Sequence, residues 1–169
     1  TDTTGDLLKK DSNGAFFILT EAGEYLSISE DWGGTAELEY SQSWGSGSSS
    51  SVAVAVEDAT FKNYVGTTVN GYAIAIKNSG TYQSDTWEDW TIKYVDSNGV
   101  IDYFNQPWMQ SIKDKESIFN QDLDGDGAKG LDATKLETAS DSSGNATDKS
   151  GDLLKKDDKG SLFIVDDND

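Results

Sequence analysis

The sequence of 169 residues contains no cysteine and no histidine, and it contains no arginine either. Without thiols the chain can form no disulfide, and without imidazole it has neither the commonest general base nor the usual zinc ligands. Paired carboxylates of the glycosidase kind remain available, but an abundance of acids does not single out any pair. These absences exclude most familiar catalytic centres, and we therefore expect a protein that is not an enzyme.

Positive charge is also scarce. The chain carries 31 acidic residues against 13 basic ones, all of them lysine, which gives a formal net charge of -18. Phosphate groups attract basic surfaces and are gripped best by guanidinium groups, so we expect no nucleic-acid partner. No apolar run approaches the roughly 20 residues of a membrane span, so we expect no membrane insertion. The first residues lack the character of a signal peptide, which indicates an internal piece of a longer protein.

One acidic stretch, residues 122–132 (DLDGDGAKGLD), has the spacing of a calcium-binding loop. Three carboxylates on alternate residues occupy loop positions one, three and five, and a glycine falls at position six, where such a loop turns sharply. A solvated acidic turn is the alternative, but carboxylates this close repel one another unless a cation lies between them. Position twelve lacks the usual acid, so the last ligand is open and the nearest acid lies one residue early. We predict that Ca²⁺ is bound by Asp122, Asp124, Asp126, Ala128 and Asp132.

Two segments near the ends of the sequence are near copies of one another. Residues 1–18 (TDTTGDLLKKDSNGAFFI) match residues 147–164 (TDKSGDLLKKDDKGSLFI), an offset of 146 positions. Such a duplication is typical of a tandem array, in which one unit is followed by the start of the next. We therefore predict a β-rich repeat unit over residues 1–137, a polar linker over 138–150 and the start of another unit over 151–169.

The second copy is too short to own a core, and a lone hairpin is marginally stable in water. A sheet edge that accepts the first copy would also accept the second, either in the same chain or in a neighbouring copy. Such a contact would link units head to tail. We predict that four apolar side chains of the second copy are buried against a sheet: Leu153, Leu154, Phe163 and Ile164.

Between the two copies, apolar residues recur mostly with a period of two. Residues 52–56 and 72–76 are apolar at every position, which predicts central strands buried on both faces. Residues 26–29 and 36–40 alternate with polar residues, as in strands with one solvated face.

Three Asn-Gly pairs, at 13–14, 70–71 and 98–99, predict tight hairpin turns with positive φ. The last pair would join residues 90–95 and 100–104 into an antiparallel hairpin.

One helix is predicted just before the acidic loop. It starts at Pro107, which suits a first helical position, or at Ser111, and it packs Ile112 and Phe119 on the sheet. The sequence as a whole therefore predicts a mainly β fold, an antiparallel β-sandwich or twisted sheet with one short helix leading into a calcium loop.

Four stretches together resemble the tryptophan-rich C-terminal domain family: residues 71–77 (GYAIAIK), the strand with Trp87 and Trp90, residues 95–99 (VDSNG) and residues 116–127 (ESIFNQDLDGDG). Residues 81–89 depart from the pattern in being longer and acidic. The resemblance implies a repeated domain of a large bacterial protein that is secreted or lies at the cell surface. It carries no catalytic residue over to this chain.

Five tryptophans leave two functions open. In the first, the chain is a non-enzymatic, calcium-stabilised structural repeat of an extracellular adhesin, sheath or filament, and its partners are neighbouring copies. In the second, Trp87 and Trp90 stack on a polysaccharide, with the acids between them accepting hydroxyl hydrogen bonds. The bulk of tryptophan equally suits it to fill the core of a small sandwich, so burial competes with the glycan-binding interpretation.

Overall fold

The computed structural model describes residues 5–130, 137–138, 153–156 and 162–165. The chain divides into two compact units, Thr1–Gly130 and Leu131–Asp169. Both are built of antiparallel strands, and the one short helix of the described residues lies in the first unit, which confirms the predicted mainly β fold. Among these residues no helix has the length and hydropathy needed to cross a bilayer.

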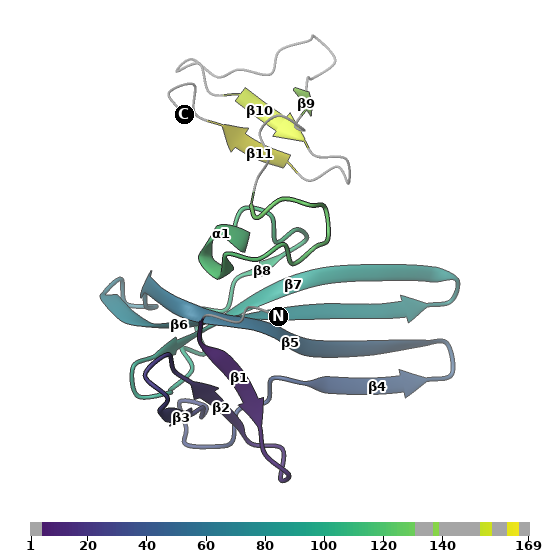
Figure 1. Cartoon of the computed structure of the whole chain (residues 1–169). Coiled ribbons are helices and arrows are strands. Elements are labelled where there is room, and N and C mark those ends of the chain that lie inside the picture. Colours follow the sequence, from purple (N-terminus) through teal and green to yellow (C-terminus); the bar gives the residue numbers. More distant parts are fainter. Residues whose placement is uncertain (1–4, 131–136, 139–152, 157–161, 166–169) are drawn as a thin grey trace. The chain divides into compact units, whose positions relative to one another are not determined.

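The first unit contains a small and a large sheet (Figure 1). The small sheet has the order β1-β2-β3, with β1 at Leu7–Lys10, β2 at Phe16–Leu19 and β3 at Tyr25–Ser27. The large sheet has the order β4-β5-β6-β7-β8, with β4 at Tyr40–Trp44, β5 at Gly47–Lys62, β6 at Thr68–Tyr82, β7 at Asp85–Asp96 and β8 at Trp108–Met109. The helix α1 spans Glu116–Phe119.

The large sheet is covered on both faces, which gives the unit two hydrophobic cores (Figure 1). On one face, Phe16 and Ile18 of the small sheet pack with Ile74 and Ile76 of β6. On the other face, the segment around α1 contributes fully buried side chains: Ile112 and Phe119 pack with Trp90, as predicted for the first two. The predicted sandwich is therefore the small sheet on the large one, with the helical segment as a third layer.

The two strands predicted to be central, β5 and β6, do lie inside the large sheet. In β6 the alternation holds, because Ile74 and Ile76 belong to one core while Ala73 and Ala75 belong to the other. In β5 it is broken by a bulge between Ala53 and Ala55. A bulge inserts an extra residue and shifts the facing of the residues after it. Val56 is therefore in the core, whereas the neighbouring valines at 52 and 54 are 46% and 42% exposed.

One of the three predicted Asn-Gly turns is wrong. Gly14 and Gly99 have φ of 87° and 84° in turns, as expected. Asn70 and Gly71 instead lie within β6, and the chain reverses earlier, in a turn that contains Gly66 with φ of 83°. Gly71 is needed there for space, because a Cβ at this position would lie 2.0 Å from the carbonyl oxygen of Val95.

Two further local predictions are corrected. The strand expected at residues 100–104 is reduced to two isolated bridges, a parallel one between Ser29 and Val100 and an antiparallel one between Val95 and Ile101, and a turn follows at residues 103–104. Pro107 does not begin a helix, since the next two residues form the edge strand β8 and α1 starts only at Glu116. Pairing with β7 outweighs the local preference of proline for a first helical turn, a tertiary override of a weak local propensity.

The second unit contains a three-stranded sheet in the order β11-β10-β9, with β9 at Glu137–Thr138, β10 at Leu153–Lys156 and β11 at Leu162–Val165. Thr138, predicted to begin the linker, thus belongs to a strand, and the second compact unit is Leu131–Asp169. That residues 151–169 are the start of another repeat unit stays a prediction. The rest of the predicted linker, residues 139–150, lies outside the described residues.

The predicted burial of the second copy is not found within this chain for two of its residues. Leu154 is 37% exposed and Ile164 is 77% exposed, while Phe163 is half-buried. The reason is that a three-stranded sheet this small covers only part of its own apolar surface. Leu153 lies in β10, but its side chain is outside the described residues.

Candidate metal centre

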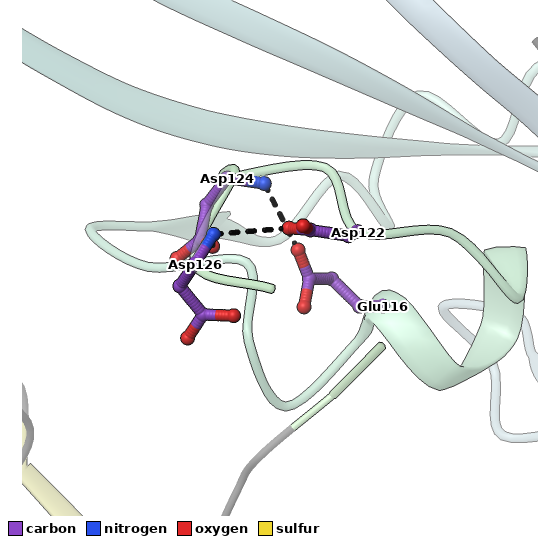
Figure 2. A group of neighbouring side chains, drawn as sticks. All are labelled: Glu116, Asp122, Asp124 and Asp126. Atoms are coloured by element: carbon purple, nitrogen blue, oxygen red, sulfur yellow. Dashed lines mark hydrogen bonds between the residues drawn. The ribbon is translucent and has the colours of Figure 1, made fainter. Parts of the chain in front are cut away.

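Four carboxylates come together from α1 and the loop that follows it. Glu116, Asp122, Asp124 and Asp126 each offer one oxygen atom, and these atoms all lie within 4.8 Å of one another. Figure 2 shows the four side chains converging. The three aspartates are those that the alternate spacing predicted, and the structure adds Glu116 to them.

The loop folds around Asp122. Its Oδ1 atom accepts a hydrogen bond from the backbone N–H of Gly125 (2.7 Å), and its Oδ2 atom accepts one from that of Gly127 (2.9 Å). These bonds curl the backbone tightly, and both glycines have positive φ, of 80° and 89°, which side-chain-bearing residues rarely adopt. The sharp turn predicted at Gly127 is confirmed.

The next two acids hold the loop at shorter range. Asp124 Oδ1 accepts from the backbone N–H of Asp126 at 3.1 Å, and Asp126 Oδ1 accepts from that of Ala128 at 2.8 Å. Ala128 therefore donates through its N–H to an acid of the cluster, and the predicted role of its carbonyl as a ligand stays a prediction. Asp132 lies outside the described residues.

The Glu116 carboxylate joins the two ends of the acidic loop by accepting hydrogen bonds from its backbone. Its side chain is fully buried, and α1 presents it to both ends of the acidic stretch. Oε1 accepts hydrogen bonds from the backbone N–H groups of Leu123 (2.7 Å) and Asp124 (3.0 Å), and Oε2 accepts one from Gly130 (3.0 Å). One carboxylate thus ties together segments that lie on either side of the turn.

Burial raises the pKa of Glu116 above its ordinary value, and the nearby charge of Asp124 raises it further. The three backbone hydrogen bonds act in the opposite direction, because they favour the ionised form. An acid that is buried beside other acids is costly to ionise, and a cation bound among them would remove that cost.

A lysine ammonium also lies at the edge of the cluster. The Nζ atom of Lys113 is 3.0 Å from Oδ2 of Asp126, and its side chain is largely buried. This ion pair compensates part of the negative charge, but four carboxylates outnumber one ammonium group. A divalent cation could neutralise most of the remainder.

The donor set consists of carboxylate oxygens, so the group could hold a hard metal ion. Sequence spacing could not identify Glu116 as its fourth member, because the usual last acid follows the loop whereas this one precedes it. The only signal in the sequence was that Glu116 lies three residues before Phe119, in the predicted helix that leads into the acidic loop.

The tryptophans predicted to bind a glycan do not form an exposed pair. Trp90 is 2% exposed and belongs to the second core, so it fills volume instead. Trp87 is 38% exposed and pairs with Gly80 in the sheet, whereas Trp90 pairs with Lys77. Residues three apart on a strand lie on opposite faces, so these two side chains cannot form one platform.

Comparisons with models of protein families, with curated proteins and with solved structures found no match to this chain. The resemblance to the tryptophan-rich C-terminal domain family therefore stays a prediction.

Proposed function

We propose that this chain is a calcium-stabilised structural module of a secreted bacterial surface protein, such as an adhesin, sheath or filament, without an enzymatic role. The observation that carries the proposal is that Glu116, Asp122, Asp124 and Asp126 each bring an oxygen atom within 4.8 Å of the others. The bacterial surface location rests on the family resemblance alone.

Calcium fits this donor set better than other common metals. Ca²⁺ takes six to eight oxygen ligands in flexible geometry, while zinc favours nitrogen and sulfur and Mg²⁺ requires a strict octahedron. A loop built by backbone hydrogen bonds to Asp122 and Glu116 supplies carboxylates from several directions, which suits a large and tolerant ion. Extracellular calcium modules bind with Kd values of about 10⁻⁴ to 10⁻³ M, within the range of calcium outside cells.

The metal would act on the fold through the second hydrophobic core. Leu123, inside the acidic loop, packs against the same core as Phe119 and Ile112. An ion that holds the loop therefore also holds the layer that covers one face of the large sheet. Binding to the folded state alone would stabilise it by about 2.7 kcal/mol when calcium is a hundredfold above Kd.

Calorimetric unfolding of the full chain tests the proposal. We expect calcium to raise the melting temperature and a chelator to lower it, and we expect Asp124→Asn to abolish most of the difference. Asp85→Asn is the matched control, because it removes one exposed charge at the start of β7, outside the cluster.

Sodium chloride at equal ionic strength separates site binding from general screening of the net charge of -18. Superimposable transitions with calcium and with chelator would refute the proposal, as would an equal response to sodium chloride.

Glycan binding is a second candidate function, and one observation at a different place favours it. Four exposed aromatic residues contact one another in a row, with ring centroids 5.3–5.6 Å apart: Trp32, Tyr103, Phe104 and Tyr64. The last three of these line a hollow of about 250 Å³ that Asp102 also lines. Aromatic faces beside hydrogen-bond acceptors suit the apolar face and the hydroxyl groups of a sugar ring.

A glycan array on the full chain tests this second candidate. Phe104→Ala should abolish any binding, whereas Tyr82→Ala removes an exposed aromatic ring elsewhere and should leave it intact. Equal binding by both variants would place the glycan away from the aromatic row.

A further inference from the structure

We propose that β10 and β11 are a transferable copy of β1 and β2, and that their partner is a second copy of this chain. In that partner they would cover the large sheet and pair with β3 in place of the partner's own β1 and β2. This inference rests on the proposed function as a structural module and names the surface through which such modules join.

The first observation is that the two hairpins have the same register. Leu8 pairs with Ile18 in the first hairpin, and Leu154 pairs with Ile164 in the second. All four residue pairs of one hairpin correspond to those of the other at the offset of 146 positions. The repeated sequence therefore forms the same local structure twice.

The second observation is that corresponding side chains differ in burial. Phe16 and Ile18 are 4% and 0% exposed, because they pack against the large sheet. Their counterparts Leu162 and Ile164 are 62% and 77% exposed. An apolar face that one copy buries is thus left open in the other, and the first copy shows what kind of surface covers it.

The third observation concerns the third strand of each small sheet. In the first unit, β3 pairs with β2, while in the second unit β9 pairs with β10, the counterpart of β1. The third strands therefore lie on opposite edges of equivalent hairpins. Within the described residues, β11 has no neighbour on the edge that corresponds to the one β3 occupies.

A lysine at the end of the first strand of the hairpin is repeated as well. Lys10 forms an ion pair with Glu39, next to the start of β4, and lies over the ring of Phe16. Lys156 occupies the equivalent position in the second hairpin and could reach the same acid of a partner. The main difference is a leucine at 162 where the first copy has a phenylalanine. A smaller side chain fills the site less well, so each chain's own hairpin should hold its place unless it is weakened.

Engineered disulfides can detect the exchange, because the chain contains no cysteine. The backbone N–H of Ile28 donates to the carbonyl of Phe16, so these two residues form a hydrogen-bonded pair of the antiparallel ladder. Hydrogen-bonded and non-hydrogen-bonded pairs alternate along such a ladder, and the Cα atoms of the second kind lie closer together. The next pair, Phe17 and Ser27, is therefore of the closer kind. The counterpart of Phe17 is Phe163. A cysteine at 163 in one chain and another at 27 in its partner should therefore meet.

In the experiment, a full-length donor carrying Phe163→Cys is mixed with a full-length receiver carrying Ser27→Cys and Ile18→Asp. Oxidised mixtures are then separated on non-reducing gels. We expect a dominant mixed dimer, and we expect Ile164→Asp in the donor to lower its yield about tenfold or more, because a carboxylate replaces the apolar side chain to be buried. A receiver with Ile18→Ala provides a milder weakening in case the aspartate prevents folding, which circular dichroism would reveal.

The matched control is a donor with Lys155→Cys, because this residue lies directly across from Phe163 but one strand further from β3. Equal cross-linking by both donors, or yields unaffected by Ile164→Asp, would overturn the inference. Calorimetry with calcium and chelator on the same proteins separates the two proposals. If calcium no longer changes the melting temperature but the specific cross-link still forms, only the proposed calcium stabilisation is refuted. If the calcium response is present but the specific cross-link does not form, only the proposed hairpin exchange is refuted.

Discussion

Replacing Glu116 with glutamine tests the candidate metal centre most sharply, because it changes one carboxylate oxygen to an amide group of the same size. The native carboxylate accepts three backbone hydrogen bonds, from Leu123, Asp124 and Gly130. A glutamine keeps one oxygen and turns an NH₂ group toward the remaining donors. At least one partly buried N–H group therefore loses its acceptor.

Two opposing effects set the size of the change. A hydrogen bond to a charged group contributes about 1.5–3 kcal/mol, and a buried donor left without a partner costs about 1–3 kcal/mol. Against this, burial raises the pKa of Glu116, so its ionised form carries a cost that the neutral amide avoids. Without calcium we expect these effects to leave a net loss of about 1 kcal/mol. With calcium bound, the ion compensates the charge, and we expect a loss of about 2–3 kcal/mol.

Scanning calorimetry in saturating calcium and in excess chelator measures both values. At about 2–4 °C per kcal/mol for a chain of this size, Glu116→Gln should melt roughly 4–12 °C lower with calcium and less than about 4 °C lower with chelator. Glu88→Gln, on β7, is the control; it removes only an exposed ion pair with Lys77, so it should change both transitions equally and by little. An equal shift in both conditions would show that Glu116 organises the loop without contributing to the ion site, and no shift would refute both roles.

Two other substitutions test the fold of the first unit. Burial raises the pKa of Asp6, and the nearby charge of Asp58 raises it further. An acid whose pKa is higher in the folded state makes the protein less stable as the pH rises through that pKa. Asp6→Asn should therefore raise the melting temperature at neutral pH and reduce the fall in melting temperature between acidic and neutral pH. An unchanged pH profile in calorimetry would contradict this. Gly71→Ala should lower the melting temperature strongly, because the added Cβ would lie 2.0 Å from the carbonyl oxygen of Val95. Gly45→Ala is the control and should be tolerated, because no atom lies within 4 Å of a Cβ added there. Equal effects of the two substitutions would refute the steric explanation.

The distribution of acids bears on how strongly a bound ion would act on this fold. At a net charge of -18 the folded chain concentrates its own negative charge, and compaction increases the repulsion. The first residue of α1 and the loop after it concentrate this charge further, with one oxygen atom from each of four carboxylates within 4.8 Å of one another. A divalent ion bound among these oxygens would replace much of their mutual repulsion with attraction to the ion.

Local sequence patterns were sufficient for several features because they depend on near neighbours. The alternation over residues 72–76 predicts a strand between two cores, since successive side chains of a strand face opposite ways. The alternate aspartates at 122, 124 and 126 converge because a short loop with glycines folds back on itself. The opposite facing of Trp87 and Trp90 could also have been read from their odd separation.

Other features depend on contacts between residues far apart in the chain. The β-bulge at Ala53 and Ala55 and the placement of Gly71 inside β6 follow from how long strands align. Strand pairing decides register over the whole ladder, so it overrides an isolated Asn-Gly turn preference.

The sequence by itself determined that the ends of this chain carry the same hairpin, because local residue pairs set its register. Only the tertiary structure decided that the apolar side chains of the first copy are buried while those of the second are exposed, because burial depends on whether another sheet packs against the hairpin. In the same way the sequence marked three acids of the candidate metal centre. Packing of α1 on the second core supplied the fourth, Glu116, because a buried side chain is positioned by everything around it.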